Sequence, residues 1–363
     1  MAGKKTKDPQ QDAEFKYLED VILREYDLRA VKKIKGGPRA WKVATDRGDR
    51  FLKLARCTRE ELDFVRQVLE HTANHGFRRI ARFIVTKFGD HFIHDGLNFY
   101  YLTDWIEGKE CSLAKLPHLE EAVFTLAEFH QAAREFTPRK RESGGPREEP
   151  IRQEWGIWQK VFEERAGRIQ EVARGYESRT SLGNQLAQLV SSKASSIYGW
   201  AIQALRLLEQ ANFRELVERD RKSRTISHRS YTGSNLIHSK KGRGAFLVDL
   251  DHCVYDVQVH DLARLMGRAL PKYQWDITIA RQIMDWYSCI RPLDELEQKA
   301  IVAYLAFPHR LYRFLEVSGP GGDMEEEAKL AGKFQQELLQ EDLRKQLLWR
   351  LVTERKLGLE LEM

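Results

Sequence analysis

The chain has 363 residues and is 42% hydrophobic, which is enough to bury a full core and to form two lobes. Its 60 basic and 54 acidic residues leave a net charge of +6 without a basic stripe, a balance that argues against a nucleic-acid partner. The lack of any run of about 18 apolar residues argues against a membrane span, and four widely spaced cysteines without a CxxC pair indicate the reduced thiols of a cytosolic protein.

The N-terminal part of the chain alternates helix-like and strand-like patterns. Residues 1–13 are rich in Lys and Gln and lack an apolar segment, so we expect a disordered basic tail and not a signal peptide. Apolar residues with helical spacing follow at 14–26, and Thr58 is a typical N-cap for a second helix that runs to about Asn74. The expected strands, which are β-like runs bounded by turn residues, lie at 28–34, 40–45, 50–55, 83–88, 91–94 and 98–105.

These elements predict a small N-lobe, residues 14–107, made of an antiparallel sheet and a helix. The rest of the chain, residues 108–363, has mostly helical patterns, with a charged Gly/Pro linker at 137–150 and a short β-like interruption at 235–251 that contains a Gly-rich turn at 240–244. The sequence therefore predicts an α+β fold with a small β-rich N-lobe and a large helical C-lobe. The helices expected in the C-lobe lie at 119–136, in two or three segments between 155 and 217, and from about 260, 276, 293 and 324.

One loop of the predicted C-lobe carries the most informative motif. It reads His228-Arg229-Ser230-Tyr231-Thr232-Gly233-Ser234-Asn235, and an apolar strand that ends in Asp249-Leu250-Asp251 follows it. At this spacing a phosphotransferase needs an Asp that accepts the proton of the substrate hydroxyl, then an Asn that holds Mg²⁺, and finally an Asp that holds the metal ions bridging the phosphates. Hard oxygen ligands suit Mg²⁺. Asn235 and Asp249 therefore form the predicted metal site of a catalytic-type loop over 228–251.

The position of the proton acceptor in this loop is occupied by a serine. Ser230 is neutral and cannot act as a base, a role that typically contributes roughly 10²–10⁴-fold to the rate. Phosphoryl transfer depends mostly on positioning and electrostatics, so the sequence leaves slow residual activity open. Asp251 is an alternative base, because it lies two residues from Asp249 on the same side of an extended segment.

A lysine inside an apolar strand is the second candidate site residue. Lys53 lies in Phe51-Leu52-Lys53-Leu54, where an unpaired ammonium would be costly. Together with the metal site it is predicted to contact the α- and β-phosphates of ATP, whereas a solvent-facing strand lysine is the alternative. Its helix partner is either Glu61 or Glu60. No G-x-G-x-x-G precedes it, and Gly36-Gly37-Pro38-Arg39 only weakly suggests a phosphate cradle.

Two more aspartates complete the candidate site. Asp104 begins Asp104-Trp105-Ile106-Glu107-Gly108, the segment that ends the small lobe and where an adenine would meet mainly backbone groups, and we assign it to the cofactor site. Asp261 opens a helix, where it either accepts backbone N–H bonds from the catalytic-type loop or acts as an ordinary N-cap. Three residues that could suggest a transition-metal site lie close together nearby, and they are His252, Cys253 and His260. They do not have a recognised ligand spacing.

At these residues the chain resembles the CotS/CotI-type spore coat proteins, a branch of the aminoglycoside- and choline-kinase-like superfamily, over roughly residues 15 to 350. The resemblance implies the bilobal protein-kinase-like fold of the aminoglycoside phosphotransferases, with ATP and Mg²⁺ as cofactors. It also implies synthesis in the mother-cell cytoplasm of a spore-former and deposition in the spore coat, with other coat proteins as partners. Beyond the loop and the segment 104–108, it rests on Leu126-Ala127-Glu128-Phe129-His130, Gly156-Ile157-Trp158 and Ala306-Phe307-Pro308-His309-Arg310.

Residue by residue, the resemblance implies Lys53 as the nucleotide lysine, Asn235 and Asp249 as metal ligands and Asp261 as the aspartate that braces the loop. Ser230 departs from the aspartate of active members. The first hypothesis is thus a degenerate kinase that binds ATP and Mg²⁺ and serves as a structural or assembly component of the coat. The alternatives are an active ATP-dependent phosphotransferase for a small-molecule or protein hydroxyl, and a sugar- or metabolite-binding module without nucleotide. No cluster of acids of the kind that would favour an aminoglycoside stands out in the helical part.

Overall fold

The computed structural model describes residues 16–32, 35–36, 39–139, 152–177, 180, 184–239, 244–317 and 324–361. The predicted tail 1–13, most of the linker 137–150 and most of the turn 240–244 lie outside the described residues. The chain divides into two compact units. Unit 1 consists of residues 1–110, 136–152 and 234–253, and unit 2 consists of residues 111–135, 153–233 and 254–363.

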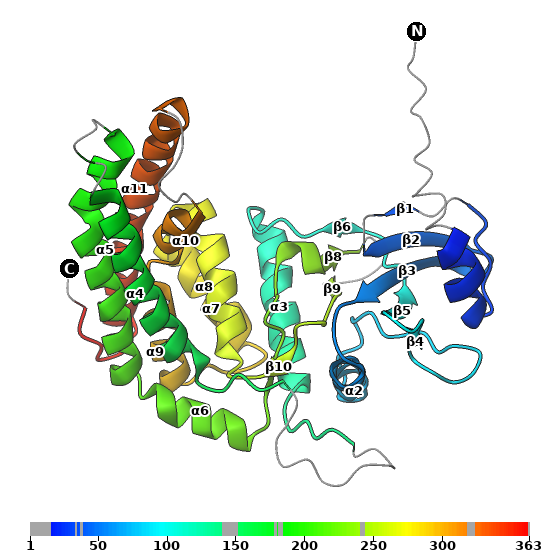
Figure 1. The fold of residues 1–363 in the computed structure, drawn as a ribbon. Coiled ribbons are helices and arrows are strands. Elements are labelled where there is room, and N and C mark those ends of the chain that lie inside the picture. Colours follow the sequence, from blue (N-terminus) through cyan, green and yellow to red (C-terminus); the bar gives the residue numbers. More distant parts are fainter. Residues whose placement is uncertain are drawn as a thin grey trace. The chain divides into compact units, whose positions relative to one another are not determined.

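Unit 1 contains an antiparallel five-stranded sheet with the order β1-β2-β3-β5-β4 (Figure 1). Alternate residues of β2 are buried, as a half-buried strand requires, and its Trp41 and Val43 pack with Leu52 of β3 in the core of the sheet. The π-helix η1 (Leu18–Leu23) adds Leu18 and Ile22 to this core. The strands are β1 (Lys35–Gly36), β2 (Ala40–Thr45), β3 (Gly48–Ala55), β4 (Ile93–His94) and β5 (Phe99–Asp104).

Helix α2 (Arg59–Asn74) begins where the sequence predicts it. The Thr58 side chain accepts the backbone N–H of Glu61, and the Glu61 carboxylate accepts the backbone N–H of Thr58, which together form a capping box. The predicted apolar stripe of this helix is buried, and it consists of Leu62, Val65, Val68 and Leu69.

A second, three-stranded sheet of unit 1 has the order β6-β8-β9 and includes the hairpin of the catalytic-type loop. Its first strand approaches β8 so closely that a Cβ atom on Gly108 would lie 2.3 Å from the carbonyl oxygen of His238, so that only glycine fits at this position. The strands are β6 (Lys109–Glu110), β8 (Leu236–His238) and β9 (Ala245–Leu247).

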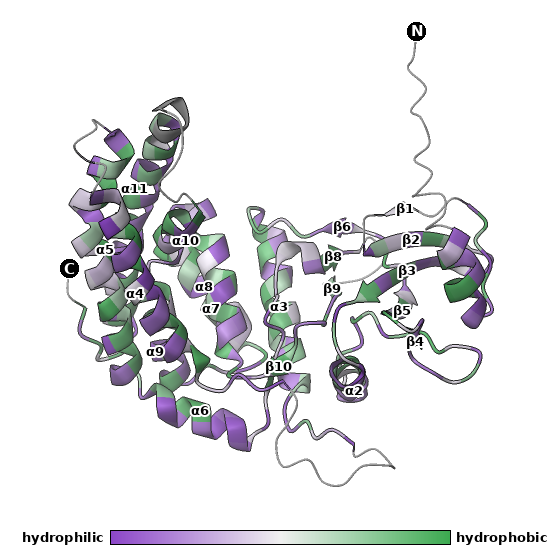
Figure 2. Cartoon of the chain, in the orientation of Figure 1, coloured by the Kyte–Doolittle hydropathy of each residue, from purple (hydrophilic) through white to green (hydrophobic). Residues whose placement is uncertain are grey.

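Unit 2 is mainly helical, and its helices are amphipathic. Figure 2 shows hydrophilic and hydrophobic residues along α4 and α5, and α4 buries Trp158, Phe162 and Ile169. Strand β7 (Ile226–Ser227), which ends just before the loop of Ser230, pairs antiparallel with β10 (Val254–Tyr255). The helices are α3 (Leu116–Ala132), α4 (Ile157–Glu177), α5 (Gln185–Gln210), α6 (Phe213–Lys222), α7 (Val259–Ala269), η4 (Leu270–Tyr273), α8 (Ile277–Ser288), α9 (Glu295–Ala306), α10 (His309–Val317) and α11 (Met324–Glu354).

Most of the predicted elements and the α+β class are confirmed, but two predicted strands are wrong. In their described residues, the segments 28–34 and 83–88 form only the isolated bridges Ala30↔Thr45 and Phe83↔Thr103. In the second segment the hydroxyl of Thr86 accepts the backbone N–H groups of Phe88 and Asp90, a local bond that competes with strand pairing. Of the helices in the described ranges, none has the length and apolar character needed to cross a membrane. None of the four cysteines, all of them described, forms a disulfide.

Candidate active site

The ammonium of Lys53 lies between two carboxylates within unit 1. Its Nζ atom is 2.6 Å from Oδ1 of Asp249 and 2.9 Å from Oδ2 of Asp251. The lysine side chain is only 15% exposed. Burial alone would lower its pKa, but the two carboxylates outweigh burial and raise the pKa above its usual value. Lys53 is therefore a paired, charged group and not a solvent-facing strand lysine.

A tyrosine that the sequence analysis did not assign completes this cluster. The antiparallel register of β3 and β5 places Tyr101 opposite Lys53, so the two side chains share one face of the sheet. The buried hydroxyl of Tyr101 donates a 2.8 Å hydrogen bond to Oδ1 of Asp251. Asp251, considered above as an alternative base, is thus bonded to both Lys53 and Tyr101.

The hairpin β8–β9 brings the predicted metal ligands into one segment of unit 1. The backbone N–H of Val248 donates to the carbonyl oxygen of Asn235 at 2.9 Å, which joins the start of the hairpin to the residue before Asp249. Asp249 has a φ of +65°, a left-handed conformation that Asp tolerates better than most residues. Backbone strain of this kind is concentrated at functional sites. The oxygen donors of Asn235, Asp249 and Asp251 and the ammonium of Lys53 are the groups that would fit Mg²⁺ and a nucleotide phosphate.

The other two residues assigned to the cofactor site are not brought to Lys53. The Glu61 carboxylate caps α2 and forms an ion pair with Arg152 at 3.3 Å, whereas Lys53 pairs with Asp249 and Asp251. Asp104 lies at the end of β5, where its side chain is 70% exposed and pairs with Arg50 at 3.1 Å. A role of Glu61 and Asp104 in cofactor binding stays a prediction.

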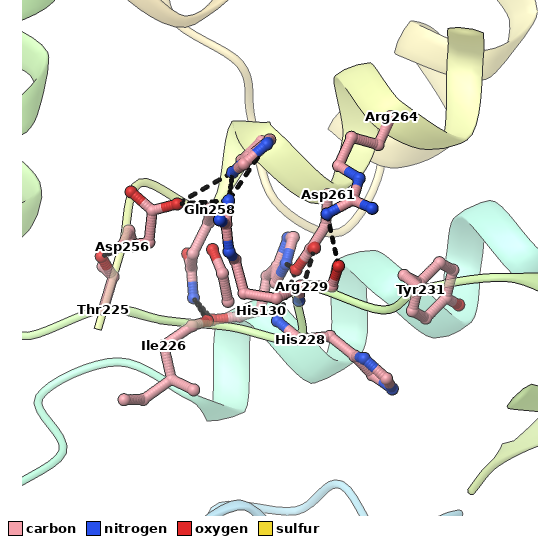
Figure 3. A network of polar contacts seen from close by, with 12 residues as sticks. His130, Thr225, Ile226, His228, Arg229, Tyr231, Asp256, Gln258, Asp261 and Arg264 are labelled. Atoms are coloured by element: carbon pink, nitrogen blue, oxygen red, sulfur yellow. Dashed lines mark hydrogen bonds and ion pairs between the residues drawn. The ribbon is translucent and has the colours of Figure 1, made fainter. Parts of the chain in front are cut away.

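In unit 2 the loop of Ser230 is braced by Asp261. The two carboxylate oxygens of Asp261 accept the backbone N–H groups of His228 at 2.5 Å and of Arg229 at 2.9 Å (Figure 3). The N-cap residue of α7 is Gln258, so Asp261 is not the cap. Of the two alternatives that the sequence left open, the structure thus confirms the brace.

Asp261 is itself oriented by His130 of α3. Nε2 of His130 lies 3.2 Å from Oδ2 of Asp261, and the hydroxyl of Tyr287 lies 2.7 Å from Nδ1 of the same ring. This network is consistent with a neutral imidazole that donates through Nε2 and accepts through Nδ1. Burial lowers the pKa of His130 to about 4. Burial alone would raise the pKa of Asp261, but the hydrogen bonds that it accepts lower it to about 2. Asp261 is therefore an anion at neutral pH.

Hydrogen bonds with α7 and α3 also hold the loop around Ser230. Arg264 donates to the carbonyl oxygen of Arg229, and Arg268 donates to that of Tyr231 at 2.8 Å. The Tyr231 hydroxyl donates to the carbonyl oxygen of Ala122 at 2.7 Å. The residues on both sides of Ser230 are therefore fixed, although the acid expected of an active enzyme is absent from position 230.

The glycine of this loop and the neighbouring histidine have structural explanations. A Cβ atom on Gly233 would lie 2.1 Å from the carbonyl oxygen of Cys111, which accounts for a glycine there. His260 lies 2.9 Å from Asp256, a carboxylate that also pairs with Arg229 at 3.2 Å. Among the described residues, no group of three or more His, Cys, Asp or Glu side chains is arranged to hold a metal ion.

Kinase-like proteins combine a small sheet unit with a larger helical unit. Here the sheet unit carries Lys53 paired with Asp249 and Asp251, and the helical unit carries a loop whose backbone is held by Asp261. The chain matches the family model described as the phosphotransferase enzyme family over residues 31–297, and it belongs to this family.

The predicted resemblance to the spore coat and aminoglycoside-phosphotransferase proteins is confirmed by the proteins to which this chain is similar. The chain is 24% identical to spore coat protein S of Bacillus subtilis (strain 168) over 285 residues, 78% of either chain. Its fold is similar to that of an aminoglycoside phosphotransferase from Alicyclobacillus acidocaldarius, with a TM-score of 0.77, 20% identity and 98% of both chains covered. The spectinomycin phosphotransferase APH(9)-Ia, solved with ADP and spectinomycin, has a TM-score of 0.56 at 10% identity and covers 93% of this chain and 98% of its own. The predicted aminoglycoside-phosphotransferase fold is therefore confirmed.

Proposed function

We propose that this chain is a spore-coat-associated kinase-like protein that binds ATP with Mg²⁺, lacks an efficient catalytic base and acts as a structural or assembly component of the coat. The observation that carries the proposal is Ser230 in an intact, braced loop. Asp261 still anchors the backbone of His228 and Arg229, so the loop keeps its support without its acid.

Nucleotide binding is supported by the charges around Lys53. One ammonium faces the carboxylates of Asp249 and Asp251, so this cluster has an excess of negative charge. A nucleotide triphosphate alone would be repelled by it. Bound Mg²⁺ supplies the positive charge that links phosphate oxygens to carboxylates. Asn235 and the two aspartates would hold the ion and Lys53 would pair with the phosphates, and nucleotide binding therefore depends on Mg²⁺.

Location in the coat is supported by the similarity to spore coat protein S, which covers 78% of this chain. The protein would be made in the mother-cell cytoplasm and deposited in the spore coat, where its partners are other coat proteins. The alternative function is ATP-dependent phosphotransfer to a small-molecule or protein hydroxyl. The retention of Lys53, Asn235 and Asp249 favours this alternative, because a scaffold that binds no nucleotide has no need of them.

Thermal unfolding of the full chain with ATP, with Mg²⁺ and with both tests nucleotide binding. At about a hundredfold excess over its Kd a ligand adds roughly 2.7 kcal/mol to the free energy of unfolding. We expect a shift that needs both ligands and disappears in Asp249→Ala. Asp49→Ala, which removes an exposed aspartate of the same unit that pairs with Lys42, is the matched control and should keep the shift. No shift at millimolar ATP and Mg²⁺ would contradict the nucleotide site.

A further inference from the structure

A cavity of about 860 Å³ lies wholly within unit 2. Its walls come from helices α4, α7, α9, α10 and α11 and include Arg229 and Gly233 of the loop that carries Ser230. Pockets for small organic ligands usually measure about 300–1,000 Å³. The cavity is therefore large enough for a ligand of metabolite size.

The charges on the cavity walls are strongly unbalanced. Eight Arg and Lys side chains line it, against the two glutamates Glu316 and Glu341. Three of the eight cations, Arg229, Arg310 and Arg344, form ion pairs with carboxylates, and Arg344 already uses Glu341. The remaining five form no ion pair with a carboxylate in the described part of the chain, and they are Arg165, Arg264, Arg268, Lys272 and Arg313.

Two of these cations are held close together on one helix. Arg264 and Arg268 are one turn apart on α7 and therefore share a face, an arrangement that is unfavourable for like charges. Burial and the positive charge of Arg264 lower the pKa of Arg268, and Arg313 adds to this effect. A bound anion would offset the repulsion between these guanidinium groups.

The same walls contain polar donors without acceptors. The indole Nε1 of Trp158, a residue that is 2% exposed, has no hydrogen-bond partner in the described ranges. No described group bonds to the hydroxyl of Tyr304 either, and this side chain lies in the positive field of Arg264, Arg165 and Arg268. These donors and the uncompensated cations all favour a ligand that is rich in acceptor oxygens.

We propose that this cavity binds a small organic polyanion that carries phosphate or carboxylate groups. Four of the five uncompensated cations are arginines, whose planar guanidinium groups bind two oxygens of a phosphate or carboxylate at once. A polycationic ligand such as an aminoglycoside would be repelled. Since Arg264 and Arg268 also donate to the carbonyl oxygens on either side of Ser230, the bound anion would contact the side chains that position this loop.

Calorimetric titration of the full chain with fructose 1,6-bisphosphate, with citrate and with neutral fructose tests the proposal. The titrations are run with EDTA and without nucleotide, once at low and once at high ionic strength, and each series keeps its ionic strength constant. We expect the bisphosphate or citrate to bind, with an affinity that falls as salt rises, and fructose not to bind. Binding of citrate but not of the bisphosphate would support the polyanion site and assign it to carboxylates, and the reverse result would assign it to phosphates.

Two arginines of α4 provide a matched pair of variants. Arg165 lines the cavity, whereas Arg168 is exposed and pairs with Glu171. Arg165→Gln and, separately, Arg313→Gln are expected to weaken polyanion binding about tenfold or more, and Arg168→Gln is expected to leave it unchanged. Asp249→Ala, a change in unit 1, should also leave it unchanged. The proposal is overturned if neither polyanion binds, if both cavity variants keep full affinity, or if Asp249→Ala abolishes binding.

Discussion

The hydroxyl of Tyr101 donates a 2.8 Å hydrogen bond to Asp251 and thereby joins strand β5 to the hairpin segment that follows β9. Asp251 also pairs with Lys53 of the adjacent strand β3, and the carbonyl oxygen of Asp251 accepts a bond from Arg152. Three segments that are far apart in the sequence therefore meet at Asp251, two of them at its carboxylate and one at its carbonyl oxygen. The position of Asp249, two residues earlier, depends on these contacts.

Replacing the tyrosine should destabilise the protein. Tyr101→Phe removes a buried donor from Asp251, and we expect the free energy of unfolding to fall by about 1–3 kcal/mol. Urea unfolding measures this change. Tyr17→Phe is the matched control, because it removes a similar 2.7 Å bond to Asp95 at a more exposed position and should cost less. Equal losses of unfolding free energy in the two variants would show that the buried bond of Tyr101 stabilises the protein no more than the more exposed bond of Tyr17.

Replacing the carboxylate of Asp261 with an amide should destabilise the protein. Asp261→Asn puts one oxygen and one NH₂ group where two oxygens now accept the N–H groups of His228 and Arg229, so that two donors face each other. We expect a loss of about 3 kcal/mol or more in urea unfolding, because the site is fully buried.

An exposed aspartate offers the control for this change. Asp276 accepts the backbone N–H groups of Thr278 and Ile279 at the start of α8, where Asn is nearly as good an N-cap. Asp276→Asn should therefore have a small effect. A similar loss in both variants would mean that the buried brace is not what stabilises the loop.

Acid should weaken the contribution that three buried histidines of unit 2 make to stability. Burial lowers the pKa of His130 to about 4 and that of His309 to about 3, and it lowers the pKa of His260 well below 6.5. Between pH 6.5 and 4 these histidines bind protons in the unfolded chain but not in the folded chain, so their contribution to the free energy of unfolding falls as the pH falls. Asp256 acts in the opposite direction, because burial raises its pKa to about 8 and the folded chain takes up this proton first. The contribution of His130 alone is on the order of 3 kcal/mol. Asp261, whose pKa is lowered to about 2, adds a further loss below pH 4.

Urea unfolding at pH 7.5, 6 and 5 measures this dependence. His130→Gln, which keeps a donor for Asp261 but cannot be protonated, should show a weaker decline than the unmodified chain. His94→Gln, at an exposed position, should leave the decline unaltered. An unaltered decline in His130→Gln would remove this histidine from the explanation.

Restoring the acid at position 230 should restore chemistry. Ser230→Asp is expected to raise the rate of γ-phosphate transfer or ATP hydrolysis about a hundredfold or more, within the range of general-base catalysis. Ser230→Asn has nearly the same size without the charge and should give no increase. Removal of the predicted metal ligand in the double variant with Asp249→Ala should abolish the gain. Ordinary kinase rates in the unmodified chain would instead favour the active phosphotransferase.

The elements that could be predicted from the sequence are those with local signals. Strand β2 shows alternating burial, and helix α2 has a capping box, so both were placed to within a residue or two. The segment 83–88 has the composition of a strand but ends in a turn around the Thr86 hydroxyl. Its apolar residues are partly unburied, with Phe88 71% exposed, so composition misled the prediction.

The candidate site could be predicted only in part, for the same reason. Motif spacing identified Asn235 and Asp249, but the carboxylate partners of Lys53 and the role of Tyr101 depend on the register of β3 against β5 and on the hairpin that lies against them. Local sequence could not decide between a cap and a brace for Asp261, because its donors are about thirty residues away. The cavity arginines converge through helix packing, which no short motif encodes.

The contacts that hold the loop of Ser230 do not depend on the type of side chain at position 230. Asp261 bonds to main-chain N–H groups of residues 228 and 229, and α7 bonds to the carbonyl oxygens of residues 229 and 231. None of these contacts uses the side chain at position 230. An acid and a hydroxyl can therefore replace each other at this position without disturbing these contacts. Related chains that share this architecture and these contacts can therefore carry different side chains at the position of the proton acceptor.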